Sequence, residues 1–311
     1  MPPGFFCLLA DPSGFLGTPW PAALWLKVFQ FKVMFPPPTG RISEMSWEPG
    51  VWDVLSNCCW AGVVSFSGTM PTLRLLPFSI LLGVVGILCV GLTGFWCYHW
   101  RGGFGWDGTA RMFNWHPVFM VMGMVVLYGA AALVYRLPLS RRGSKLPWKL
   151  LHAALALVAF LLAVLGLVAV FSYHKARTIA NMYSLHSWVG LTAVVLFSCQ
   201  WLMGFSTFLL PWAPTWLRGL YKPIHVFFGC AIFMLAIAAS ISGINEKLFF
   251  SLNNATVLYS SLPPEAWFAN TLGLLIVVLG WMVLWALSKP AWKHPELDSP
   301  EAQQPLPEED K

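Results

Sequence analysis

From residue 75 onward the chain alternates between long apolar runs and short polar connections. A run of about 20 apolar residues is what an α-helix needs to cross ~30 Å of hydrocarbon. We find six such runs, at residues 75–98, 115–135, 149–171, 186–209, 223–243 and 269–288. The pattern therefore predicts an all-α fold with six transmembrane helices.

Composition excludes a soluble domain. Of the 311 residues, 57% are hydrophobic and 10% are charged, and the mean hydropathy is +0.65. The seven cysteines have no metal-binding spacing and four lie within the apolar runs, which favours apolar packing over a disulfide framework. No nucleic-acid partner is expected for such a chain.

The same pattern divides the chain into three segments. Residues 1–70 are rich in proline and tryptophan, and Lys27 and Lys32 interrupt their apolar stretch. We expect a poorly ordered cytosolic extension there, with a segment lying on the membrane surface as the alternative. Residues 71–289 form the six-span membrane domain. Residues 290–311 are rich in proline and acidic residues, which predicts a disordered cytosolic tail.

Loop charges predict the orientation. The connection between the second and third runs contains no acidic residue but five basic ones, Arg136, Arg141, Arg142, Lys145 and Lys149. The positive-inside tendency puts this connection, and by parity both termini, in the cytosol. The loop after the fifth run then faces the lumen or exterior. It holds the one Asn-X-Thr sequon of the chain, so Asn254 is an expected N-glycosylation site.

Four successive runs carry a histidine near their start, at His116, His152, His186 and His225. Prolines mark three of these starts, because a first helical turn tolerates a missing N–H: Pro117, Pro147 and Pro223. The positive end of a helix dipole disfavours imidazolium, so it keeps these rings in the neutral form that binds a metal.

Because successive spans cross the membrane in opposite directions, the four histidines fall at two depths. His116 and His186 lie near the lumenal face, and His152 and His225 lie near the cytosolic face. Two rings at one depth can face each other across a bundle, which is the geometry of a six-coordinate haem. We therefore predict a central four-helix bundle that holds two haems.

Other roles for the histidines stay open. Zinc is disfavoured, because two histidines leave its tetrahedral shell half empty. Single histidines also form hydrogen bonds between membrane helices, and several together can form the proton relay of a channel or transporter. Against a transporter, the runs contain no short, glycine-broken helix pair of the kind that builds a transport site.

Five stretches resemble the cytochrome b561 family of ascorbate-dependent transmembrane electron carriers, over residues 75–289. They are ALVYR (132–136), KLPWKLLH (145–152), SLHSW (184–188), KPIH (222–225) and ISGINEK (241–247). The spacing of the four histidines is also that of the family. Within it, the chain is most similar to the lysosomal, ascorbate-dependent members.

The resemblance implies two haem b groups and the residues that bind them. His116 and His186 would hold a lumenal haem, and His152 and His225 a cytosolic one. Arg136 and Lys145 would contact the cytosolic haem. The residues expected around the lumenal haem are Asn181, Met182, Tyr183, Ser184 and Glu246. Residues 181–184 should also cap the helix that carries His186. For Glu246 the alternative is a solvated helix end beside Lys247.

The resemblance also implies two substrate sites. Cytosolic ascorbate, a monoanion, would dock on Lys145, Lys149 and Arg218. The alternative for each cation is ordinary positive-inside charge. On the lumenal side, His174 would belong to the acceptor site; its alternative is an unremarkable exposed histidine.

The function implied is stepwise one-electron transfer by an ascorbate-dependent oxidoreductase. Electrons would pass from cytosolic ascorbate through the two haems to a ferric iron complex or monodehydroascorbate. A homodimer in the late endosome or lysosome membrane is expected from the family. In the acidic stretch of the tail, however, Leu306 lies alone between two prolines, and there is no acidic dileucine signal, so the plasma membrane or another endomembrane stays an alternative.

Overall fold

The computed structural model describes residues 75–137, 140, 144–253, 257–289 and 292. The predictions for residues 1–70, for Asn254 and for the tail other than Trp292 lie outside these residues. In the described ranges the chain consists of helices joined by short loops, with one isolated β-bridge between Asn253 and Leu258.

Six helical segments in the described part are long and apolar enough to cross a membrane, as predicted. The first is α3 (Leu75–His99). The second is composite and consists of α4 (Ala110–Phe113), α5 (Trp115–Met120), the π-helix η2 (Val121–Leu127), α6 (Tyr128–Leu133) and the 3₁₀-helix η3 (Val134–Arg136). The other four are α7 (Leu146–Arg177), α8 (Leu185–Phe208), α9 (Thr215–Ser251) and α10 (Pro264–Ser288). A short 3₁₀-helix, η5 (Tyr259–Ser261), precedes α10.

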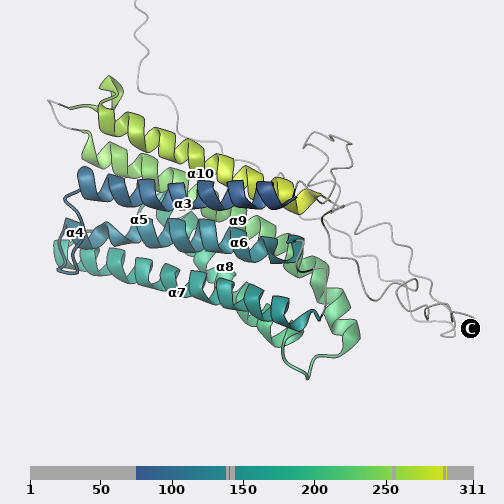
Figure 1. Ribbon diagram of the computed structural model, residues 1–311. Helices are drawn as coiled ribbons and strands as arrows, with labels where there is room; N and C mark the ends of the chain where they lie inside the picture. Colours follow the sequence, from purple (N-terminus) through teal and green to yellow (C-terminus); the bar gives the residue numbers. More distant parts are fainter. Residues whose placement is uncertain (1–74, 138–139, 141–143, 254–256, 290–291, 293–311) are drawn as a thin grey trace, which may run out of the picture. The chain divides into compact units, whose positions relative to one another are not determined.

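The four histidine-bearing segments pack together into a bundle. In Figure 1, α7 and α8 lie on one side of the membrane domain, while α3 and α10 lie on the other and pack against η2, α6 and α9. The all-α prediction with a four-helix bundle is therefore confirmed, with the two remaining spans covering one side of it.

Small residues allow the bundle helices to approach closely. Ala159 and Ala163 of α7, Ala193 of α8 and Ala236 of α9 are all buried in the same core. Because lipid is as apolar as a leucine side chain, membrane helices associate through close packing, which small residues permit.

Several boundaries differ from the prediction: α7 continues to Arg177, α10 begins at Pro264, and α9 is longer at both ends. Helix α9 begins at Thr215, so Pro223 lies inside it and does not mark its first turn. Proline is tolerated inside membrane helices because neighbouring groups satisfy the freed carbonyl, and for this reason the proline was a misleading boundary signal. Trp292, within the segment predicted as a tail, is buried against the rings of Phe78 and Trp285.

A close approach between two spans gives a test of this packing. A Cβ added at Gly123 of η2 would lie 2.8 Å from the carbonyl oxygen of Ala159 on α7, whereas nothing lies within 4 Å of one added at Gly83 of α3. We expect Gly123→Ala to destabilise the protein by about 1–3 kcal/mol through overpacking. Gly83→Ala should be neutral, or stabilising by up to about 1 kcal/mol from helix propensity.

Thermal unfolding of both variants in the same detergent measures the difference. Equal stability of the two variants would contradict the close packing of η2 on α7.

Candidate functional site

His116 and His186 face each other near one end of the bundle. His116 lies on α5 and His186 on α8, and their ring centroids are 6.1 Å apart with an interplanar angle of 86°. A metal held between two imidazole nitrogens at about 2 Å from each puts the ring centroids roughly 6 Å apart. The two rings of this His116/His186 pair are therefore far enough apart for one metal ion to be held between them.

His152 and His225 form a second pair near the other end. His152 lies on α7 and His225 on α9, and their ring centroids are again 6.1 Å apart, with an interplanar angle of 68°. Within the described residues, no group of three or more His, Cys, Asp or Glu side chains could hold a metal ion. Each pair thus suits a metal whose remaining ligands come from elsewhere, such as a macrocycle.

Backbone carbonyls orient three of the four rings. The Nδ1 atoms of His116, His152 and His186 donate to the carbonyls of Gly166 (3.1 Å), Ala131 (2.7 Å) and Ala239 (2.8 Å). These bonds assign the proton to Nδ1 and leave Nε2 free to bind a metal. A histidine ligand usually donates its other ring N–H in this way.

His225 is the exception, because its buried Nδ1 has no partner among the described residues. Its ring is held sterically instead. A Cβ added at Gly204 of α8 would lie 2.8 Å from Cε1 of His225, and one added at Gly243 of α9 would lie 2.6 Å from Cε1 of His186. Each pair therefore has one ring packed directly on a glycine.

The two pairs lie at separate levels of the bundle. His152 is on α7, and His116 bonds to Gly166 fourteen residues further along the same helix. At ~1.5 Å per residue the two levels are roughly 21 Å apart. Apolar and aromatic side chains, including Phe197 and Phe233, fill the core into which these helices pack.

The positions of the histidines within their helices differ in part from the prediction. His116 and His186 are second residues of α5 and α8, but His152 is the seventh residue of α7 and His225 the eleventh of α9. The effect of the helix dipole falls off within the first turn. The dipole argument therefore fails for His152 and His225.

Two of the three cations predicted to bind ascorbate meet at the end of α8. Lys149 Nζ donates to the carbonyl of Phe208 (3.5 Å), and an Arg218 Nη2 donates to that of Leu210 (3.1 Å). The Phe208 ring in turn lies 5.5 Å from the ring of His225. Lys145 is the N-cap residue of α7, one turn before Lys149. All three thus lie at the end of the bundle that holds the His152/His225 pair.

Arg136 lies at the same end but contacts a different helix. Its guanidinium donates to the carbonyls of Lys289 (2.7 Å) and Leu287 (2.5 Å), where α10 ends. These bonds satisfy carbonyls that a helix end leaves without a partner. Its expected contact with a haem carboxylate stays a prediction.

At the opposite end, two predicted residues of the α7–α8 connection meet. The ring of His174 is hydrogen-bonded through Nδ1 to the Asn181 side chain, 2.9 Å away and exposed. Ser184 is the N-cap residue of α8, and its hydroxyl accepts from the backbone N–H of Ser187. The predicted capping of this helix is therefore present.

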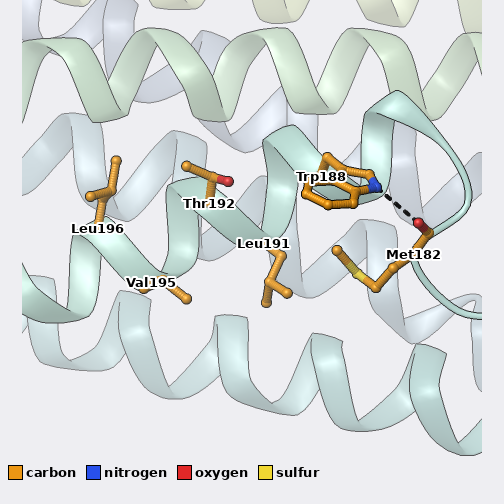
Figure 2. Close-up of a pocket in the computed structure, with 6 residues that line it drawn as sticks. All are labelled: Met182, Trp188, Leu191, Thr192, Val195 and Leu196. Atoms are coloured by element: carbon orange, nitrogen blue, oxygen red, sulfur yellow. Dashed lines mark hydrogen bonds between the residues drawn. The ribbon is translucent and has the colours of Figure 1, made fainter.

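Met182 points elsewhere. Its carbonyl accepts from Trp188 Nε1 (2.9 Å), and its side chain lines a groove of about 270 Å³ along α8 (Figure 2). At 3.6 residues per turn, the groove residues Trp188, Leu191 and Val195 lie on the opposite face of α8 from His186. The structure thus brings the Met182 side chain to the outer face of α8 and not to the His116/His186 pair.

Tyr183 and Glu246 interact with each other. Burial and the charge of Glu246 raise the pKa of the Tyr183 hydroxyl. The Tyr183 ring also lies 6.4 Å from that of Phe250, further along α9. The residue that reaches toward His116 is Lys247, for which the sequence pattern predicted no role of its own. Its Nζ lies 4.2 Å from the centroid of the Phe113 ring, and that ring lies 5.9 Å from His116.

Fold and site together define a class: a six-span helical membrane protein with one opposed histidine pair at each of two levels. Comparison with known proteins identifies the family within this class. The profile of eukaryotic cytochrome b561 matches residues 115–251. The lysosomal membrane ascorbate-dependent ferrireductases of Mus musculus and Homo sapiens are 60% and 61% identical over 227 residues, which is 73% of this chain and 94% of each relative.

A plasma membrane ascorbate-dependent reductase of Xenopus laevis is 49% identical over 223 residues, covering 72% of this chain and 77% of the relative. The chain therefore belongs to the cytochrome b561 family, as its motifs indicated.

The glycine beside His225 gives a test of the site. Gly204→Ala should push the His225 ring away from His152, so that the haem expected between these two rings is lost. Gly190→Ala on the same helix is a matched control, because its added Cβ would meet nothing closer than 3.8 Å. Absorbance of haem per chain, measured after purification, distinguishes the two variants. Full haem content in Gly204→Ala would contradict the close contact between α8 and His225.

Proposed function

We propose that the chain is a transmembrane oxidoreductase that takes electrons from cytosolic ascorbate and delivers them to an acceptor on the other side of the membrane. The single observation that carries the proposal is the opposition of two histidine rings at each of two levels. Family membership and the names of the relatives support ascorbate as the donor.

The residues present fit haem b at both levels. Each level offers two imidazoles at axial separation in apolar surroundings, and three of the four donate Nδ1–H to a carbonyl. His116 and His186 would hold one group, and His152 and His225 the other. When bound, each haem supplies a one-electron carrier in a medium where neither ascorbate nor iron can dissolve.

The chain itself orients the histidine rings and encloses the space between the two levels. Carbonyls of Ala131, Gly166 and Ala239 keep three Nε2 atoms unprotonated and aimed across the bundle. The apolar core between the levels excludes water. This core also counts against a histidine proton relay, because such a relay needs polar groups along its path.

Charge supports the orientation. Among the described residues, the end with the His152/His225 pair has six Lys/Arg side chains and no Asp or Glu, whereas the other end has five Lys/Arg and all three acidic residues. The more basic end faces the cytosol by the positive-inside tendency. Both termini are then cytosolic.

The same charges attract the donor. Ascorbate is an anion, and Lys145, Lys149 and Arg218 lie at the end of the bundle that holds the His152/His225 pair. A cluster of cations raises the local concentration of an anion and adds charge-assisted hydrogen bonds once it docks.

We place the acceptor at the end with the His116/His186 pair, where the half-buried His174 is hydrogen-bonded to the exposed Asn181. A ferric complex is favoured over monodehydroascorbate, because the Mus musculus and Homo sapiens relatives are named ferrireductases. Their names also support the lysosomal membrane as the location. A homodimer stays a prediction from the family.

Removal of one ligand at a time tests the pairing. We expect His116→Ala and His152→Ala each to bind one haem where the unmodified chain binds two, because the levels are separate. Haem and protein are quantified in purified samples, and His99→Ala, which belongs to neither pair, is the control. Loss of both haems from each variant, in protein that remains folded by circular dichroism, would contradict separate sites.

The docking cations are tested with two reductants. The double variant Lys145→Ala, Lys149→Ala should need at least ten-fold more ascorbate for half-maximal reduction, since a hydrogen bond to a charged group contributes about 1.5–3 kcal/mol. Reduction by dithionite should be unchanged. Lys175→Ala, at the opposite end of α7, is the control. Equal loss with both reductants would refute docking at this end.

A further inference from the structure

A cluster of buried and half-buried charge beside the His116/His186 pair has more cations than carboxylates. It consists of Arg101, which follows α3, Lys247 of α9 and Glu265 of α10. Glu265 is 6% exposed and the Arg101 side chain 16%. Buried charges are costly unless they are paired, so the uneven count needs an explanation.

Arg101 and Glu265 form one ion pair. An Nη2 of Arg101 donates to Oε1 of Glu265, which also accepts from Trp96 Nε1 (2.8 Å). This pair uses the one carboxylate of the cluster. The Nε of Arg101 is buried and has no partner among the described residues.

Lys247 is the second cation and lacks a counter-ion. In the described ranges, no carboxylate lies within 4 Å of its Nζ, which instead lies over the face of the Phe113 ring at 4.2 Å. Lys247 is close enough to Arg101 for electrostatic repulsion between them, and both cations interact electrostatically with the buried thiol of Cys97. The carboxylate of Glu246, the residue before Lys247, interacts electrostatically with the Tyr183 hydroxyl.

The cluster adjoins both rings of the pair. The Phe113 ring under Lys247 lies 5.9 Å from the ring of His116. Lys247 also lies one turn of α9 beyond Gly243, which packs against the ring of His186. Asn114, two residues before His116, donates to the carbonyls of Arg101 (3.0 Å) and Gly103 (2.6 Å), so the cluster is tied to this end of α5.

We propose that Lys247 and Arg101 together form a binding site for a carboxylate group at the His116/His186 level. The proposal rests on the function proposed above. A carboxylate there balances the charge of the cluster, and two sources have the right chemistry: the carboxylate edge of the haem, or a carboxylate ligand of the ferric acceptor. If the carboxylate belongs to the haem, Lys247 is a positioning residue that also sets the midpoint potential of that haem.

The sign of the tuning follows from Coulomb's law. Reduction adds one negative charge, so a fixed cation nearby favours the reduced form and a fixed anion opposes it. Lys247→Met should therefore lower the midpoint potential of one haem and leave the other unchanged. Lys247→Arg should stay near the unmodified value. Glu265→Gln, which removes the opposing anion, should raise the same potential.

The experiment is a spectroelectrochemical titration of the purified full chain and these variants, with Lys175→Met as an exposed control at the same end. We expect at least a ten-fold change in the ratio of reduced to oxidised haem at fixed potential, which is about 59 mV for one electron. Opposite shifts in Lys247→Met and Glu265→Gln exclude a general packing defect, which has no reason to change sign. If Lys247→Met does not accumulate, Glu265→Gln carries the test.

A second readout separates the two sources. If the carboxylate belongs to the acceptor, Lys247→Met keeps its potentials but needs at least ten-fold more ferric citrate for half-maximal oxidation of the ascorbate-reduced protein. If neither quantity changes, the inference is wrong. The unmodified chain separates failure of this inference from failure of the proposed function. If the purified unmodified chain contains no haem, both are wrong. If it contains two haems, and Lys247→Met has the same potentials and the same ferric citrate requirement, only the inference is wrong.

Discussion

The structure depends on the opposition of two imidazole rings across the bundle, once at each of two levels. The partners come from α5 and α8 at one level and from α7 and α9 at the other, so no ring faces a histidine of the next helix along the chain. Each pair therefore ties together two spans that the sequence separates by a third. A group held between the rings would lock the four helices into one arrangement.

The packing around the rings follows from this constraint. Carbonyls of Ala131, Gly166 and Ala239 are available because the small residues of the bundle let neighbouring helices approach closely. Gly204 and Gly243 leave room for rings that any side chain would displace. In lipid, an imidazole without such partners is costly, so the sites and the close packing depend on each other.

Much of this could be predicted from the sequence, because its strongest signals are local. Run lengths indicated the six spans, and parity with loop charge sorted His116, His152, His186 and His225 into the two pairs that the structure brings together. The start of α9 was missed because Pro223 resembles a first-turn proline, although a membrane helix tolerates it inside. Lys247 was overlooked because its contact with the Phe113 ring joins residues that are distant in sequence.

Electron transfer across the bilayer through these two histidine pairs is the central claim. Vesicles that contain the purified chain, loaded with ascorbate and surrounded by a ferric chelate and a ferrous-specific dye, test it most directly. We expect ferrous iron to form outside at a rate proportional to the amount of protein, and the rate to fall to the protein-free level when His116 or His225 is replaced by alanine. An unmodified chain that reduces external iron no faster than empty vesicles would contradict the claim.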